Sequence, residues 1–324
     1  MWAILPYLFP LAIIVFANLG ETRSAWRMLT YVCLALLNVA AFGLGLLSFA
    51  VPLLAYLTEV AVLPSLPGLS FIATGLAAMA TSALGLISLV TPVRRWLARY
   101  LHLDPNSPVH TTALVFLLYF ATTSLGTLLG AGEWLSAGLE LVDVSAWAVV
   151  SGQVVFILLA IAGTGLGLRR SPRQTVQRLG LGGLSVRSLG MAALMVLGFL
   201  VLDYVTALLW QRLWPASYQA IMDSSQQLFA RFATPVGALM LGLAAGVGEE
   251  TLFRGALQPV FRIPLTAMVF TLGHVQYGLS PAAVEVLLIG LALGWLRNRT
   301  NTTTCIVVHM AYNFLDLLIA PLFP

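Results

Sequence analysis

The sequence predicts an all-α protein, a polytopic transmembrane helical bundle of about ten helices. Of its 324 residues, 60% are hydrophobic and only 9% are charged, whereas about 25% charged residues are usual in soluble domains. Apolar runs of about 20 residues, long enough to cross a hydrocarbon core of about 30 Å, recur along the chain. The runs lack the alternation of a membrane barrel. Helices are therefore the expected class, because lipid cannot satisfy open backbone groups.

Ten membrane spans are expected from these apolar runs. They cover residues 3–20, 28–57, 69–92, 111–131, 145–168, 188–210, 235–258, 264–278, 281–296 and 302–321. The eighth and ninth are short for a bilayer and require shielding by other helices. The first has no basic leader before it, so we expect a retained helix and not a cleaved signal peptide.

The distribution of charge gives these spans an orientation. All sixteen cationic side chains are arginines, and thirteen of them fall in loops on one side of the predicted membrane. Only Arg212 and Arg231 fall on the other side. The positive-inside rule then places the arginine loops in the cytoplasm and both termini outside. We expect an integral protein of a bacterial cytoplasmic membrane, whose net charge of +4 orients helices and does not bind nucleic acid.

Composition divides the chain into three parts. Residues 1–168 hold five spans and only peripheral charges, which predicts an N-terminal five-helix membrane module of unknown role. Residues 169–187 are rich in arginine and are expected to form a cytoplasmic linker. Residues 188–324 contain every chemically informative residue and are expected to form a catalytic membrane domain.

An acid pair inside the span 235–258 is the strongest chemical signal. Glu249 and Glu250 are adjacent, and Arg254 follows Glu250 by one helical turn. An ionisable group near the bilayer centre costs roughly 2.5–3.5 kcal/mol on insertion scales, so two adjacent acids indicate a functional site. Arg254 is expected to pair with Glu250. Glu249 projects about 100° away around the helix, so it is not expected to pair with Arg254 and can contact other groups.

Two further polar patterns lie on two later spans. Phe270-Thr-Leu-Gly-His274 falls in the span 264–278, and His309-Met-Ala-Tyr-Asn313 falls in the span 302–321. The spacing of four puts the His309 imidazole and the Asn313 amide on one helix face.

Depth in the membrane relates these patterns to one another. At 1.5 Å per residue, Glu249, His274 and His309 lie about 13, about 15 and about 10 Å from the cytoplasmic face. Three spans thus bring polar groups to a common level. The sequence predicts one polar site in the cytoplasmic half of the membrane.

A carboxylate, two imidazoles and an amide around a wet pocket are suited to hydrolysis. The carboxylate can deprotonate a water with help from one imidazole, while the other imidazole and the amide donate to an oxyanion. One glutamate and two histidines are also a catalytic zinc set, so Glu249, His274 and His309 are candidate metal ligands. Zinc is the cofactor that these residues could hold, and they leave both mechanisms open.

In this order on successive helices, the three patterns resemble the CPBP family of intramembrane proteases. That family includes type II CAAX prenyl endopeptidases and bacteriocin-processing and immunity proteins, and the resemblance covers about residues 240–320. It implies that Glu249 with His274 activates the water. It also implies that His309 and Asn313 stabilise the oxyanion.

The remaining motif residues, Glu250 and Arg254, would support the site in such a family member. The resemblance implies an intramembrane endopeptidase that cleaves a membrane-associated substrate, such as a prenylated or leader peptide, near the cytoplasmic face of the bilayer. A non-proteolytic scaffold or immunity protein of the same family is the alternative. An ion-coupled transporter is a third class, but the inverted repeats or broken helices that it needs are not visible.

Other features of the predicted catalytic domain have structural interpretations. Asp203 and Asp316 fall nearer the outer face, where snorkelling or hydrogen bonding is expected, and Glu285 is expected at the interface. Small residues spaced by four, Gly242 with Gly246 and Gly290 with Gly294, predict close helix packing.

Overall fold

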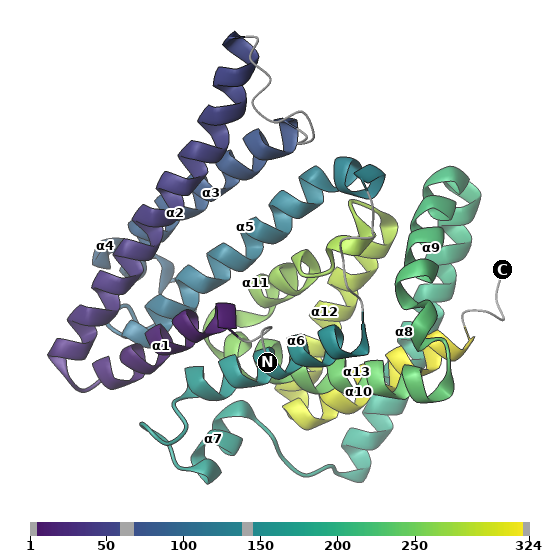
Figure 1. Cartoon of the computed structure of the whole chain (residues 1–324). Helices are drawn as coiled ribbons and strands as arrows, with labels where there is room; N and C mark the ends of the chain where they lie inside the picture. The colour runs from purple at the N-terminus through teal and green to yellow at the C-terminus, as the bar shows by residue number, and fades with distance from the viewer. Residues whose placement is uncertain (1–4, 59–67, 138–144, 320–324) are drawn as a thin grey trace. The chain divides into compact units, whose positions relative to one another are not determined.

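The structure, a computed structural model, consists of helices joined by turns and loops in the residues that it describes (Figure 1). It describes residues 5–58, 68–137 and 145–319. Within those ranges there is no β-strand, and an isolated bridge joins Leu166 to Arg170. The predicted all-α membrane class is confirmed.

The helices gather into two compact units, which are described separately. The N-terminal unit comprises Ile13–Val142 and Leu272–Gly278. The motif unit comprises Met1–Ala12, Asp143–Thr271 and Leu279–Pro324. The motif unit thus includes a helix that lies before the predicted linker.

The N-terminal unit is built from apolar helices and the turns between them. Its helices are α1 (Leu5–Gly20, of which residues 13–20 belong here), α2 (Ser24–Thr58), α3 (Gly68–Ser88), α4 (Thr91–Leu97) and α5 (Pro108–Ala137). Helices α2 and α3 pack side by side, and α5 packs against α3 (Figure 1). The buried amide of Asn38 donates to Leu34 O at 2.7 Å within its helix and accepts from the Tyr119 hydroxyl at 3.1 Å. Internal bonds of this kind satisfy polar groups that lipid could not.

The motif unit holds most of the remaining helices. They are α6 (Ala146–Thr164), α7 (Pro172–Leu179), α8 (Val186–Leu213), α9 (Pro215–Phe229), α10 (Pro235–Glu250), a π-helix (Thr251–Leu257), α11 (Gln258–Leu272, whose last residue belongs to the other unit), α12 (Pro281–Arg299) and α13 (Thr302–Ile319). A short 3₁₀ turn follows α9 at Ala230–Phe232, whereas the turn that follows α11, Val275–Tyr277, belongs to the N-terminal unit. Helix α10 packs against both α13 and α6 (Figure 1).

The number of candidate spans is smaller than the ten predicted. Among the described residues, seven helices are long and apolar enough to cross a membrane, or eight if the bent pair α3 and α4 counts as one span. The expected spans 235–258 and 264–278 join into one helical segment, Pro235–Leu272. The first expected span contains only a shorter apolar helix, Tyr7–Gly20. The stretch Pro235–Leu272 counts once by length and composition, although its backbone is non-helical at Arg262, inside the predicted gap between the two spans.

The bend inside Pro235–Leu272 lies where the sequence predicted a boundary. Arg262 has a φ of 62° within α11, and Pro264 follows two residues later. A positive φ is strained for a residue with a side chain, and proline cannot continue the helical hydrogen bonding. The helical backbone is therefore broken at Arg262, between the residues expected to form two separate spans.

The arginine-rich segment 169–187 is ordered in the motif unit. Ser171 and Gln174 form a reciprocal capping box at the start of α7, an arrangement that satisfies the first free N–H groups of a helix. At its end, the Leu179 carbonyl accepts from the Thr302 hydroxyl at 2.6 Å. The segment expected as a linker is therefore tied to the start of α13.

Candidate active site

The acid pair occupies the junction between α10 and the π-helix. Glu250 is the last residue of α10, and Thr251–Leu257 form the wider π turn. π-Helical turns are rare and occur frequently at functional sites. Arg254 Nη1 lies 3.1 Å from Glu250 Oε1, with both side chains almost fully buried. The ion pair predicted from their spacing is confirmed.

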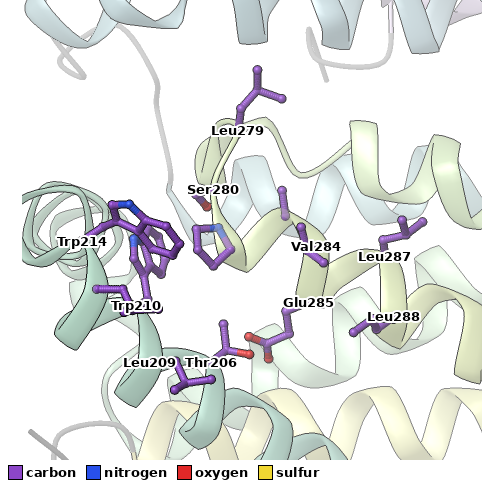
Figure 2. A pocket seen from close by; sticks show the side chains of 13 residues that line it. Thr206, Leu209, Trp210, Trp214, Leu279, Ser280, Val284, Glu285, Leu287 and Leu288 are labelled. Carbon is purple, nitrogen blue, oxygen red and sulfur yellow. The ribbon is translucent and has the colours of Figure 1, made fainter.

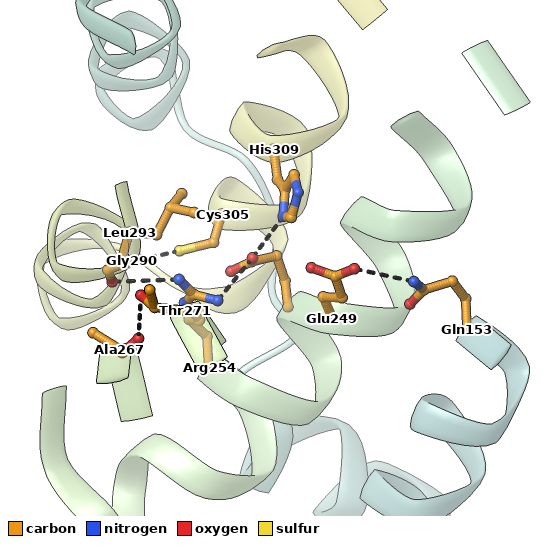
Figure 3. Close-up of polar contacts among 10 residues, drawn as sticks. Gln153, Glu249, Arg254, Ala267, Thr271, Gly290, Leu293, Cys305 and His309 are labelled. Carbon is orange, nitrogen blue, oxygen red and sulfur yellow. Dashed lines mark hydrogen bonds and ion pairs between the residues drawn. The ribbon is translucent and has the colours of Figure 1, made fainter. Parts of the chain in front are cut away.

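Glu250 also holds a histidine from another helix. His309 Nδ1 on α13 lies 2.8 Å from the same oxygen, Glu250 Oε1, and the imidazole is only 6% exposed (Figure 3). A carboxylate that accepts from Nδ1 sets the ring orientation and leaves Nε2 for other contacts. The supporting acid of the motif therefore positions one of the predicted catalytic histidines.

Arg254 is held on three sides within the unit. Besides Glu250, its Nη2 donates to Gly290 O at 3.3 Å, and its Cζ lies 4.3 Å from the centroid of the Phe270 ring. The Phe270 ring centroid is also 6.0 Å from that of His309. The Phe270 of the second motif thus packs between the guanidinium and the imidazole.

Glu249 points to a different helix from Glu250. Its Oε1 accepts a hydrogen bond from Gln153 Nε2 of α6 at 3.0 Å (Figure 3). Within the described part of the chain, Glu249 Oε2 is buried without a hydrogen-bond partner, as is Glu250 Oε2. The two adjacent acids therefore differ in their partners: Glu250 has a guanidinium and an imidazole, whereas Glu249 has a neutral amide.

Gln153 was not identified from the sequence. It is the only side-chain amide in α6, and an amide inside an apolar helix can be satisfied by an interhelical hydrogen bond. Its isolation among apolar residues is the signal that could have found it. Its partner could not have been inferred, because 96 residues separate it from Glu249.

His274 does not lie inside a helix, contrary to the prediction. Helix α11 ends at Leu272, and His274 is the residue before the 3₁₀ turn Val275–Tyr277. Its ring stacks on that of Tyr277, with centroids 6.3 Å apart and an interplanar angle of 6°. Gly273 lies in a turn directly after the helix end. Since His274 belongs to the N-terminal unit, its pairing with Glu249 remains a prediction.

Asn313 follows His309 by one turn of α13 and is partly buried. The i, i+4 spacing keeps both side chains on one helix face, as the sequence predicted. Their joint role at an oxyanion is not tested by this arrangement.

The structure gives no support to the zinc alternative. Among the described residues, no three or more His, Cys, Asp or Glu side chains are grouped so that they could hold a metal ion. The acid bonded to His309 is Glu250, which already carries Arg254. Glu250 is not one of the predicted zinc ligands, which were Glu249, His274 and His309.

The π-helix is stabilised from the ordered arginine segment. Arg178 of α7 donates from Nη1 to Gly255 O at 3.0 Å and from Nη2 to Ala256 O at 3.4 Å. These bonds satisfy carbonyls near the end of the π turn. Burial, and then the positive charges of Arg170, Arg297 and Arg169, lowers the pKa of Arg178.

A second set of buried acids lies elsewhere in the motif unit. Glu285 borders a cavity of about 680 Å³ between α8 and α12, whose wall includes Trp210 and Trp214 (Figure 2). Glu285 is only 6% exposed, so its side chain is buried within the protein. It accepts from the Tyr312 hydroxyl at 3.4 Å.

Asp203 and Asp316 complete this second set and interact with each other through a side-chain hydrogen bond. This agrees with the hydrogen bonding expected for both residues. We call Asp203, Glu285 and Asp316 the acid cluster, and Glu250, Arg254 and His309 the motif cluster.

Long apolar helices and a buried polar site define an integral membrane protein with a candidate intramembrane active site. Residues 231–315 match the family model described as Type II CAAX prenyl endopeptidase Rce1-like. That segment contains the motif residues of α10, the π-helix, α11 and α13. The predicted resemblance is confirmed over this quarter of the chain. No curated protein and no solved structure matches the chain.

Proposed function

We propose that the protein is an intramembrane endopeptidase in which Glu249 activates the attacking water. The observation that carries the proposal is the division between the adjacent acids. Glu250 is held by Arg254 and His309, whereas Glu249 has an amide partner and a second oxygen with no partner in the described residues. A carboxylate that is not neutralised by a cation is the better general base.

The reaction is peptide-bond hydrolysis by one water. Glu249 takes a proton from the water, whose oxygen attacks the peptide carbonyl carbon, and His274 shares that proton. The carbonyl π electrons move onto oxygen, where His309 Nε2–H and the Asn313 amide would donate to the oxyanion. Glu250 beside Nδ1 stabilises a charged imidazole, as in other carboxylate–histidine pairs. The oxyanion collapses, the C–N bond breaks, and the stored proton passes to the leaving amine.

The substrate that we propose is a membrane-associated peptide or protein, prenylated or carrying a leader peptide. Support comes from the matched family description, which names prenyl endopeptidases. The arginine loops favour cleavage in the cytoplasmic half of a bacterial membrane, with both termini outside. The bilayer itself is then part of the binding environment.

Replacement of Glu249 by Gln tests the proposal. The purified chain would be reconstituted in phospholipid vesicles with an internally quenched, S-farnesylated peptide that ends in a CAAX sequence. We expect a loss of about 10²- to 10⁴-fold in cleavage rate, the usual size of a general-base contribution, with normal membrane insertion. For natural substrates, membrane peptides from cells with the native chain and with Glu249→Gln would be compared by mass spectrometry.

Unchanged cleavage and unchanged membrane peptides in Glu249→Gln would contradict the protease and favour the non-proteolytic scaffold. Removal of metal ions by a chelator tests whether cleavage depends on zinc. Cleavage by the native chain should persist after treatment with 1,10-phenanthroline. If cleavage is lost and is recovered when zinc is added, a metal-dependent mechanism replaces the glutamate mechanism.

A further inference from the structure

A glycine next to the acid pair lets α6 approach α10 closely. A Cβ atom on Gly248 would collide with Gln153 Oε1 and would lie 2.8 Å from Gln153 Cβ and 3.0 Å from Gln153 Cα. Since two of these atoms belong to the backbone or its first side-chain carbon, rotation of the glutamine could not relieve the clash. The absence of a side chain at Gly248 therefore allows this part of α6 to pack closely against α10.

The other glycines of α10 face a different neighbour. A Cβ on Gly242 would lie 2.7 Å from Met310 O of α13, and one on Gly246 would lie 3.0 Å from Ile306 O. The predicted small-residue face thus packs on α13, while Gly248 admits α6. Glu249 follows at the point where α10 is enclosed by both helices.

The chemistry of the two side chains fixes the direction of their hydrogen bond. An ionised carboxylate only accepts, so the nitrogen of Gln153 must face Glu249 Oε1. In Figure 3, Glu249 lies between Gln153 and the motif cluster of His309 and Arg254. Glu249 Oε2 is buried and has no hydrogen-bond partner among the described residues.

From this geometry we infer that Gln153 is a positioning residue that holds Glu249 Oε1 and so leaves Oε2 to take the proton of the attacking water. The inference rests on the proposed function and adds a residue that lies outside the segment matched by the family model. A fixed carboxylate lowers the number of unproductive orientations, and small misplacements of a reacting group reduce rates strongly. The other reading is a hydrogen bond that only joins α6 to α10.

Replacement of Gln153 by Met separates the two readings, because Met has similar length and flexibility but no donor. With the S-farnesylated peptide, we expect kcat to fall about ten- to a hundredfold, with KM changed by no more than about twofold. A purely structural bond would lower the amount of folded protein and leave kcat per folded molecule unchanged. Ser151→Ala is the matched control, since Ser151 Oγ donates only within α6, to Ala148 O at 3.0 Å.

Replacement of Gly248 by Ala tests the same contact from the other helix. The added methyl should displace Gln153 and reproduce the loss in kcat, although Gln153 itself is intact. Gly152→Ala is its control, because a Cβ on Gly152, the neighbour of Gln153 in α6, would meet no atom within 4 Å.

A chemical probe makes the test independent of cleavage. Dicyclohexylcarbodiimide reacts with protonated carboxyl groups in apolar surroundings, and its adduct on Glu249 can be quantified by mass spectrometry. Loss of the donor from Gln153 disfavours the charged carboxylate, so labelling of Glu249 should rise about fivefold in Gln153→Met, the factor expected for one hydrogen bond. Labelling in Ser151→Ala should equal that of the native chain.

The outcomes are distinguishable. Native kcat together with native labelling in Gln153→Met overturns the positioning role, even if Glu249→Gln is inactive and the protease stands. Raised labelling with native kcat shows a contact without a positioning function and also overturns it. Native cleavage in Glu249→Gln overturns the proposed function, and the role of Gln153 in catalysis falls with it.

Discussion

The motif cluster and the acid cluster are two buried polar groups that share helix α13. His309 belongs to the first, and Asp316, about two turns later on the helix, belongs to the second. The motif cluster combines an acid, a guanidinium and an imidazole at hydrogen-bond distance. The acid cluster combines carboxyl groups with the Tyr312 hydroxyl.

The difference lies in how each cluster satisfies its charge. Glu250 is balanced by Arg254 and gives His309 one orientation. The Asp203 and Asp316 carboxyl groups instead interact with each other and not with a guanidinium or an imidazole in the contacts described. The first arrangement fixes the orientation of an imidazole, whereas the second brings carboxyl groups together. Four predictions test this distinction.

The largest expected effect is that of Arg254→Met, which leaves Glu250 buried without its cation. Removal of one partner of a buried ion pair costs about 3–5 kcal/mol, so both the free energy of unfolding and cleavage should fall sharply. Denaturant unfolding in micelles measures the first. Arg231→Met, at an exposed position, should change it by less than about 0.5 kcal/mol. Equal stability of the two variants would show that the motif cluster does not depend on its charge balance.

A second prediction compares two residues of α13. His309→Gln should lower cleavage by about 10²- to 10³-fold, the size of one lost oxyanion donor, with folding largely retained. Tyr312→Phe removes the hydroxyl that donates to Glu285 and should cost about 1 kcal/mol of stability with cleavage close to native. Kinetic assays and unfolding curves on both variants provide the comparison. Similar losses of cleavage in His309→Gln and Tyr312→Phe would contradict a functional difference between the motif cluster and the acid cluster.

The third prediction concerns the packing that brings α10 to α13 beside the motif cluster. In Gly242→Ala the new methyl meets the Met310 carbonyl, and overpacking of this kind costs about 1–3 kcal/mol. Gly198→Ala in α8 meets no atom within 4 Å and should be neutral or more stable by about 0.4–1 kcal/mol. Thermal unfolding distinguishes them. A Gly242→Ala protein as stable as Gly198→Ala would contradict the close approach of α10 and α13.

The smallest effect is expected for Asp316→Asn. Asn has nearly the same shape and can donate to Asp203, so the unfolding free energy should change by less than about 1 kcal/mol. Cleavage should remain within about twofold of the native rate. A large loss of cleavage with normal folding would instead assign the acid cluster a part in proton transfer.

Several site residues could be predicted because their signals are local. The pairing of Glu250 with Arg254 follows from one helical turn within a continuous segment, and it is present at 3.1 Å. His309 was identified because an imidazole is costly in an apolar helix, and it joins the same acid. The predicted helical position of His274 was wrong, because α11 ends at Leu272. The roles of Glu249, His274, His309 and Asn313 in catalysis stay predictions.

The amino-acid sequence by itself determined that the chain is a helical membrane protein and which polar residues lie in apolar segments. These properties follow from composition and spacing along one helix, where hydropathy and the 3.6-residue period act locally. Only the tertiary structure decided that His309 joins Glu250, that Gln153 bonds Glu249, and that helix α11 ends before His274. Contacts between helices depend on how the helix surfaces fit together. No local repeat in the sequence predicts which residues far apart in the chain come into contact.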